Sequence, residues 1–80
     1  MKLALVTVLA LLAALPTAAQ TREETLSNLA FVIGQSHGLR QLCQGPGDQY
    51  WRQRMTRLIE LEAPDPAARA PLAEHFNDGF

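Results

Sequence analysis

The chain has very little of the chemistry on which most enzymes and metalloproteins depend. Its 80 residues include one cysteine, two histidines and one tryptophan, and aromatic residues make up 6% of them. Cys43 therefore has no disulfide partner within the sequence, and no ligand pair has a spacing such as CxxC or HxxxH. No glycine-rich phosphate loop, pair of catalytic carboxylates or Ser/His/Asp arrangement stands out. The sequence thus predicts neither an enzyme nor a cofactor or metal.

Lysine is almost absent too, and the net charge is small. The full chain carries a net charge of −1, and the part that follows Lys2 has six arginines against eight acids, 6 − 8 = −2. A mildly acidic chain has no overall attraction to nucleic acid or anionic lipid, so we expect no nucleic-acid partner. Arg52, Arg54 and Arg57 lie beside Trp51, and we interpret them as a solvated helix face.

The first nineteen residues have the three-part pattern of a secretory signal peptide. Lys2 gives a positive start, residues 3–15 are uncharged and almost wholly apolar, and Thr17-Ala18-Ala19 supplies small residues for a signal peptidase. As a helix this apolar run would span only about 20 Å, against about 30 Å for a bilayer core. We predict cleavage after Ala19, a periplasmic or secreted location, and membrane contact only transiently during export.

The mature domain, residues 20–80, lies at the lower size limit for independent folding. It has 80 − 19 = 61 residues. Apolar burial would contribute on the order of 85–90 kcal/mol, and ordering the chain would cost about 90 kcal/mol. Because the two terms nearly cancel, we expect the domain to need a disulfide, a partner or more polypeptide.

The mature sequence predicts an all-α fold, because apolar residues recur at helical spacing and no segment alternates as a strand does. A first helix is expected from about Arg22 to Gln44, with Thr21 and Glu24 at capping-box spacing. Leu26, Leu29, Ala30 and Ile33 form an apolar stripe, and a neighbouring stripe continues through Val32, Ser36, Leu39 and Cys43.

Two further helices follow short, well-marked connections. Residues 45–48, Gly-Pro-Gly-Asp, form a turn signal, and Asp48 is expected to cap a helix that ends by Ala63. Asp65 and Pro66 then supply an N-cap and a first helical residue. We predict a helical hairpin plus a third helix, preceded by a signal peptide helix. The third helix is expected to direct Ala68, Leu72 and Phe76 inward.

Glycine and proline interrupt the helical pattern at four places. Gly34 and Gly38 each cost about 1 kcal/mol relative to alanine, and we interpret them as a local weak point or break. The alternative is that they permit close approach of another helix. Pro71 predicts a kink or a late start in the third helix. Gly79 is a candidate left-handed cap at its end.

Cys43 and the two histidines are the candidates for chemistry. A catalytic thiol needs a neighbouring base, but His37 lies about 120° around the helix from Cys43, and His75 could approach only through tertiary packing. A metal site would need Asp78 as well, and both histidines are expected to be exposed or at helix edges. A structural or intermolecular disulfide at Cys43 is the favoured interpretation, ahead of a buried free thiol.

The order of residues from Leu26 to Phe80 resembles that of an uncharacterised family of small exported alphaproteobacterial proteins, a domain of unknown function. The resemblance rests on Leu39-Arg40, Cys43, Trp51-Arg52, Met55, Leu58, Glu62-Ala63-Pro64, Arg69, Leu72, Phe76-Asn77 and Gly79-Phe80. It implies export and a helical fold but no activity, and Pro71 departs from the family pattern. Members typically continue past the position of Phe80 into a helical stretch with a second cysteine. The chain therefore resembles a C-terminally truncated member, and Cys43 resembles half of a disulfide whose partner lies outside this chain.

We thus expect a small secreted or periplasmic helical protein with a structural or protein-interaction role. Its partner would be a second copy or another protein, bound through Cys43 or an apolar helix face. The alternative is a thiol- or metal-dependent accessory enzyme that uses Cys43 and His75. The residues expected to serve structure or interaction are Arg40, Trp51, Arg52, Met55, Phe76 and Asn77.

Overall fold

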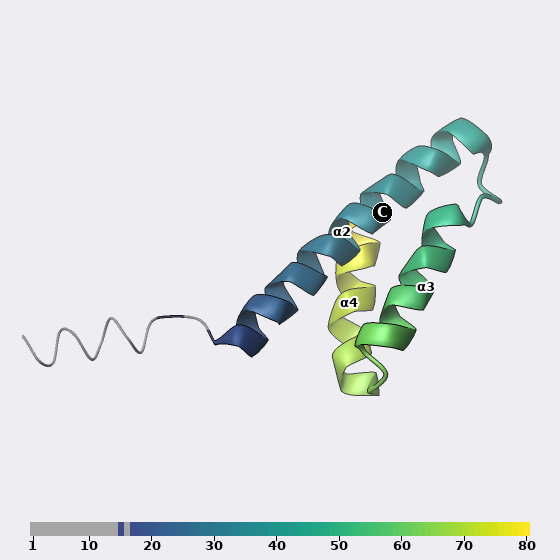
Figure 1. Ribbon diagram of the computed structural model, residues 1–80. Helices are drawn as coiled ribbons and strands as arrows, with labels where there is room; N and C mark the ends of the chain where they lie inside the picture. Colours follow the sequence, from purple (N-terminus) through teal and green to yellow (C-terminus); the bar gives the residue numbers. More distant parts are fainter. Residues whose placement is uncertain (1–14, 16) are drawn as a thin grey trace, which may run out of the picture.

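Three helices make up nearly all of the described chain. A computed structural model describes residues 15 and 17–80, and there the chain forms α2 (Ala18–Gln44), α3 (Tyr50–Glu62) and α4 (Pro66–Gly79) (Figure 1). The helices α2 and α3 form the hairpin, and α4 crosses back against the middle of α2. The predicted all-α fold is confirmed. The expected signal peptide helix lies almost wholly outside the described residues. No helix in the described part of the chain is long and apolar enough to cross a membrane.

The helix α2 begins one turn earlier than the sequence pattern predicts. Thr17, not Thr21, is its N-cap: the Gln20 amide donates to Thr17 Oγ1 (3.2 Å) and the Thr17 amide donates to Gln20 Oε1 (2.8 Å). Thr21 already lies inside the helix, where its hydroxyl donates to the Thr17 carbonyl oxygen (3.1 Å). The sequence holds two consecutive capping boxes, residues 17–20 and 21–24, and the first one along the chain forms the cap.

A tightly held turn joins α2 to α3. Gly45 ends α2 with a φ of 103°, which side-chain-bearing residues rarely adopt. Gln41 Nε2 donates to the carbonyl oxygens of Pro46 (2.9 Å) and Asp48 (3.1 Å). Asp48 was expected to cap α3, but Gln49 occupies that position. The Asp48 carboxylate instead accepts from the Tyr50 amide (3.2 Å). Asp48 therefore satisfies an amide of the first turn of α3 from the residue before the N-cap.

The helix α4 starts where the sequence places it and continues through its internal proline. Asp65 is the N-cap residue and Pro66 the first helical residue. Pro71 lies inside α4, so the predicted late start is wrong. Gly79 is the last helical residue, and Gly45 is the one residue with positive φ in the described chain, so the predicted left-handed cap at Gly79 is also wrong.

The core lies where α2 meets α4, and α3 closes it from one side. Its buried apolar residues are Ala30, Ile33, Met55, Ala63, Leu72 and Phe76, and the partly buried ones are Leu26, Trp51, Leu58 and Ile59. Contacts of α2 with α4 outnumber those with α3, and α3 touches α4 little. Leu72 and Phe76 point inward as predicted, whereas Ala68 is exposed. At the open end, Arg22 pairs with the Glu62 carboxylate.

Glycines allow α2 and α4 to cross at backbone contact. A Cβ on Gly34 would overlap the carbonyl oxygen of Phe76, and a Cβ on Gly79 would overlap the carbonyl oxygen of Phe31. A Cβ on Gly38 would lie 3.2 Å from the Phe80 carbonyl oxygen. The interpretation of Gly34 and Gly38 as a weak point is therefore wrong, and the alternative of close approach by another helix is confirmed.

Candidate functional site

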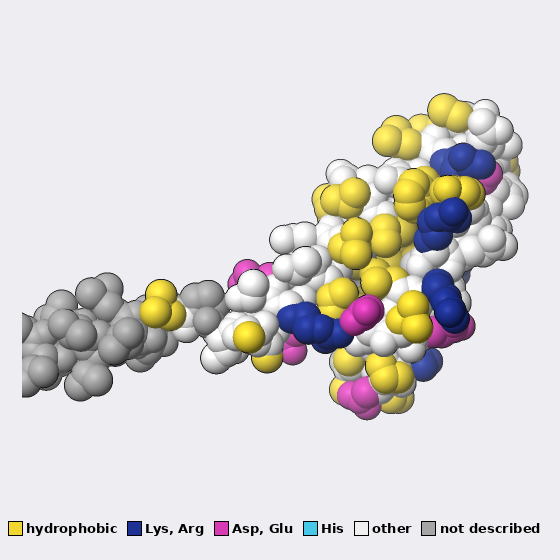
Figure 2. All heavy atoms as spheres, viewed as in Figure 1, with side chains coloured by type: hydrophobic (Ala, Val, Ile, Leu, Met, Phe, Trp, Pro, Cys, Tyr) yellow, Lys and Arg dark blue, Asp and Glu magenta, His cyan; other side chains and the backbone are white. Residues whose placement is uncertain are grey.

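One face of α2 is exposed although it is apolar. We name it the α2 outer face, and its residues are Leu29, Val32, Leu39, Leu42 and Cys43. Leu39 is 65% exposed, Leu42 is 84% exposed and Val32 is 52% exposed. In Figure 2 apolar atoms cover much of the upper part of the molecule, where α2 ends. Exposed apolar side chains that gather on one surface mark an interaction site more often than single ones do.

The α2 outer face also lacks the charges that an exposed helix normally carries. Between Thr25 and Gln44 the one charged residue is Arg40. The shorter α3 shows the ordinary pattern, because its 13 residues include three arginines and two glutamates, with the arginines exposed. In Figure 2 the dark blue atoms of basic residues lie mainly along the edge of the molecule that α3 forms. The solvated face predicted for the α3 arginines is thus present, and α2 is the exception.

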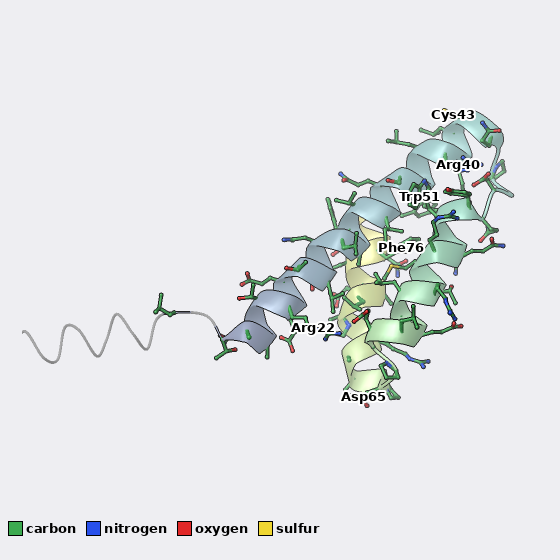
Figure 3. All side chains as sticks on the ribbon, in the orientation of Figure 1. Arg22, Arg40, Cys43, Trp51, Asp65 and Phe76 are labelled. Carbon is green, nitrogen blue, oxygen red and sulfur yellow. The ribbon has the colours of Figure 1, made fainter. Side chains whose placement is uncertain are left out.

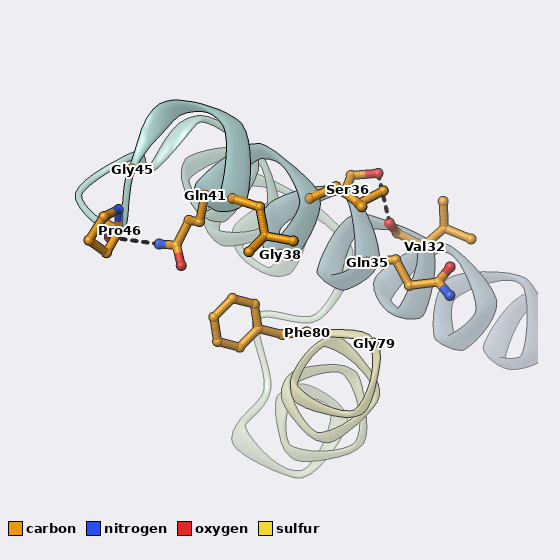
Figure 4. A pocket seen from close by; sticks show the side chains of 11 residues that line it. Val32, Gln35, Ser36, Gly38, Gln41, Gly45, Pro46, Gly79 and Phe80 are labelled. Atoms are coloured by element: carbon orange, nitrogen blue, oxygen red, sulfur yellow. Dashed lines mark hydrogen bonds between the residues drawn. The ribbon is translucent and has the colours of Figure 1, made fainter.

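An open groove borders this face on the side of α4. Figure 4 shows the Phe80 ring below Gly38, between the turn at Pro46 and the α2 residues near Val32. The groove is lined by Val32, Gln35, Ser36, Gly38, Leu39, Gln41, Leu42, Gly45, Pro46, Gly79 and Phe80, and none of them is charged. Phe80 is itself 61% exposed, so it extends the apolar surface of α2.

Cys43 lies at the carboxyl end of α2, close to a rigid polar cluster. The thiol is exposed and free, and Figure 3 shows Cys43 at the tip of the molecule next to the turn. Arg40 Nε donates to both carboxylate oxygens of Asp48 (2.9 and 3.0 Å), and the Arg40 guanidinium lies 4.4 Å from the centre of the Tyr50 ring. Arg54 stacks on the same ring at 3.6 Å. These contacts hold the end of α2 and the start of α3 in a fixed relation.

The residues expected to serve structure or interaction divide between the core and the surface. Met55 and Phe76 are buried, and Trp51 is half-buried and packs against the core, as Figure 3 shows for Trp51 and Phe76. Arg52 and Asn77 are exposed. The structure brings the first three together but leaves the other two apart from them.

His37 differs from the prediction, whereas His75 agrees with it. The His37 side chain is 2% exposed, and its ring centre lies 5.5 Å from that of Phe76 and 5.0 Å from that of Phe80. The expectation that both histidines are exposed or at helix edges is therefore wrong for His37. Because His37 is buried and Cys43 is exposed, the two do not form a thiol–imidazole pair. No cluster of possible metal ligands occurs among residues 15 and 17–80.

The comparisons with known proteins connect this helical arrangement to one family. A family model described as "Protein of unknown function (DUF2385)" matches residues 21–80, which include α3, α4 and α2 from Thr21 onward. The chain belongs to this family. No curated protein and no solved structure matches it. The predicted resemblance to a domain of unknown function is thereby confirmed.

Apart from Cys43, the members of the exposed apolar surface were not among the residues predicted to serve structure or interaction; they are Leu29, Val32, Leu39, Leu42 and Phe80. A signal for them exists in the sequence. The stretch from Thr25 to Gln44 has almost no charge, which is unusual for a helix with only one side buried. The position of the charges along the predicted first helix would have pointed to its stretch from Thr25 to Gln44.

Proposed function

We propose that this protein is an exported helical module whose role is to bind another polypeptide through the α2 outer face. The observation that carries the proposal is the combination of exposure, apolarity and missing charge on a single helix face. Leu39 and Leu42 are more than half exposed, and no charged side chain lines the adjacent groove. Burial of apolar surface is the main favourable term in most protein association.

Export is supported by the sequence pattern of residues 1–19. A positive start, an uncharged apolar run and small residues before Gln20 are what a signal peptidase requires. The family match begins at Thr21, which leaves the expected signal segment outside it. A periplasmic or secreted protein of this size gains stability from a partner, since its own core is small.

A first experiment tests export. The full chain is produced in a bacterial host, the cells are fractionated, and the intact mass of the product is measured. We expect a chain that begins at Gln20 in the periplasmic or secreted fraction. A full-length chain that still carries Met1 and stays in the membrane fraction contradicts export.

A second experiment tests the binding surface in cells. The photoreactive residue benzoylphenylalanine is placed at Leu39 or at Leu61, which is 62% exposed on α3 and so matches Leu39 in exposure. Irradiation is expected to give one covalent adduct of discrete mass from position 39 and none from position 61. Equal labelling at both positions, or no adduct at position 39, contradicts the proposed role of the α2 outer face.

The alternative of a thiol- or metal-dependent enzyme has no observation in its favour. Cys43 is at the end of α2 and exposed, and His75 is an exposed residue of α4. The structure records no contact between their side chains within the described chain.

A further inference from the structure

Four residues of the α2 outer face, together with the half-buried Ser36, have the spacing of a two-stranded helical pair, and Leu42 flanks them. Leu29, Ser36 and Cys43 follow one another at intervals of seven residues. Val32 and Leu39 are also seven residues apart, and each lies between two members of the first set. Steps of three and four residues place the five side chains along one seam, as positions a and d of a coiled coil are. Gly34 lies on the opposite side of α2, against Phe76 of α4, and the core residues Ala30 and Ile33 lie between Gly34 and the seam, with Ile33 next to the seam. One helix thus carries two neighbouring contact faces.

From this seam we infer that the α2 outer face packs against the same face of a second copy, with the two α2 helices parallel. The inference deepens the proposed function and rests on it, because it names the polypeptide that covers the surface.

Charge favours an identical partner over an acidic or basic one. The seam is uncharged, and the nearest charged side chain, Arg40, is already paired with Asp48 at 2.9 Å. A charged partner surface would lose hydration without gaining an opposite charge. Two copies of a neutral face meet without like-charge repulsion.

The area is sufficient for a weak dimer. The exposed fractions of Leu29, Val32, Leu39 and the flanking Leu42 leave about 400 Å² of apolar surface per copy, if a fully exposed side chain of this size has about 170 Å². Two copies would together bury about 800 Å², which is the size of a weak, transient interface. We therefore expect association in the micromolar range rather than an obligate dimer.

The parallel arrangement follows from where the exposed surface is greatest. Exposure rises from Leu29, at 42%, to Leu42, at 84%, and so is largest at the carboxyl end of α2. In a parallel pair, related by a two-fold axis along the helices, the carboxyl ends of the two α2 helices lie against each other. In an antiparallel pair the carboxyl end of each α2 lies against the less exposed amino-terminal part of the other. In the parallel pair the two Cys43 side chains lie in the same layer of the seam.

The experiment measures the molar mass of the exported chain by light scattering during size-exclusion chromatography, with reductant present. The unchanged chain is compared with Leu39→Glu, Leu42→Glu, Cys43→Ser and the matched control Leu61→Glu. Twice the chain mass is expected for the unchanged chain, Leu61→Glu and Cys43→Ser. The Leu39→Glu and Leu42→Glu variants are expected to elute at the mass of one chain, with unchanged circular dichroism, because these leucines are exposed in the single chain.

Several results overturn the inference. The unchanged chain could have the mass of one chain at all concentrations tested, Leu39→Glu could match Leu61→Glu, or the Cys43→Ser variant could lose the dimer. If the photochemical adduct at position 39 has a mass other than twice the chain, the second copy is wrong but the proposed function stands. If position 39 gives no adduct, the proposed function itself is wrong.

Cross-linking at Cys43 tests the orientation. A short-armed bis-maleimide, which adds one thiol at each end, should link the two chains of a parallel dimer through Cys43. In an antiparallel dimer centred on Ser36 the two thiols would be about 20 Å apart along the helix axes. Cross-linking is expected in the unchanged chain and in Leu61→Glu, and it should be lost in Leu39→Glu. A dimer of doubled mass that does not cross-link contradicts the parallel arrangement.

Discussion

The two faces of α2 differ in how they achieve an apolar surface and in what that surface does. The inner face uses buried side chains, Ala30 and Ile33 among them, and reaches backbone contact with α4 through Gly34. The outer face uses large side chains such as Leu39 and Leu42, which remain exposed. A long helix with almost no charge between Thr25 and Gln44 can thus be covered on one side by its own chain and still present a second apolar side.

Among truncations to alanine, the largest expected effect is the loss of a buried aromatic ring that packs against the inner face. Phe76→Ala removes a side chain that is 7% exposed and packs against α2, and it should lower the free energy of unfolding by about 3–5 kcal/mol. Leu42→Ala on the outer face should change it by less than about 0.5 kcal/mol in a dilute single chain. Urea denaturation followed by circular dichroism measures both. A similar loss for the two variants would remove the distinction between the faces.

The second effect is that of a side chain at Gly34, where α2 and α4 cross. The sign of the change in the free energy of unfolding is diagnostic. Helix propensity alone predicts that Gly34→Ala stabilises α2 by about 1 kcal/mol. Because a Cβ there would overlap the Phe76 carbonyl oxygen, we expect a destabilisation of about 2–3 kcal/mol instead. Gly47→Ala is the control, since nothing lies within 4 Å of a Cβ at that position. A Gly34→Ala chain that is more stable than the unchanged one contradicts the close crossing.

A third, smaller effect concerns the polar cluster that fixes the end of α2 relative to α3. Arg40→Ala removes two hydrogen bonds to Asp48 and a stacking contact with Tyr50, so it should cost about 1–2 kcal/mol. Arg52 is exposed on α3, and Arg52→Ala should cost less than about 0.5 kcal/mol. The midpoint of thermal unfolding compares the two variants. Equal shifts would mean that Arg40 acts only as a surface charge.

The smallest effect should come from a charge on the outer face of the single chain. Leu39→Glu is expected to change the free energy of unfolding by less than about 0.5 kcal/mol under dilute conditions, because Leu39 is mostly solvent-exposed. Ile33→Glu, which puts a carboxylate at a position 8% exposed, should unfold the chain. Denaturant titrations at low protein concentration separate these outcomes, and a large loss of stability for Leu39→Glu would place this residue in the core.

Helix positions could be predicted from the sequence because their ends carry strong local signals. Pro66 begins α4, and Gly45 ends α2, as turn chemistry requires. The first cap was misplaced because Thr17 and Thr21 both begin a capping box, and local chemistry does not rank them. Pro71 remains helical because contacts between α4 and α2 outweigh the local penalty of a proline.

The features that could not be predicted all depend on which helices meet. Gly34 is a weak point in an isolated helix and a contact point once the backbone of α4 crosses it. His37 is buried because Phe76 and Phe80 arrive from α4 and the end of the chain, and no spacing within α2 contains that information. The apolar residues Val32 and Leu39 were recognised as a stripe, but only the tertiary arrangement decides that this stripe stays exposed.

The central claim is that α2 has one face closed by its own chain and a second face that is covered by another copy. Methyl NMR of the exported chain, recorded over a dilution series, observes both faces in one experiment. The account predicts that the methyl signals of Val32, Leu39 and Leu42 shift with protein concentration while those of Ile33 and Leu72 do not. Methyl signals on both faces that are independent of concentration, or that shift to the same extent, would contradict it.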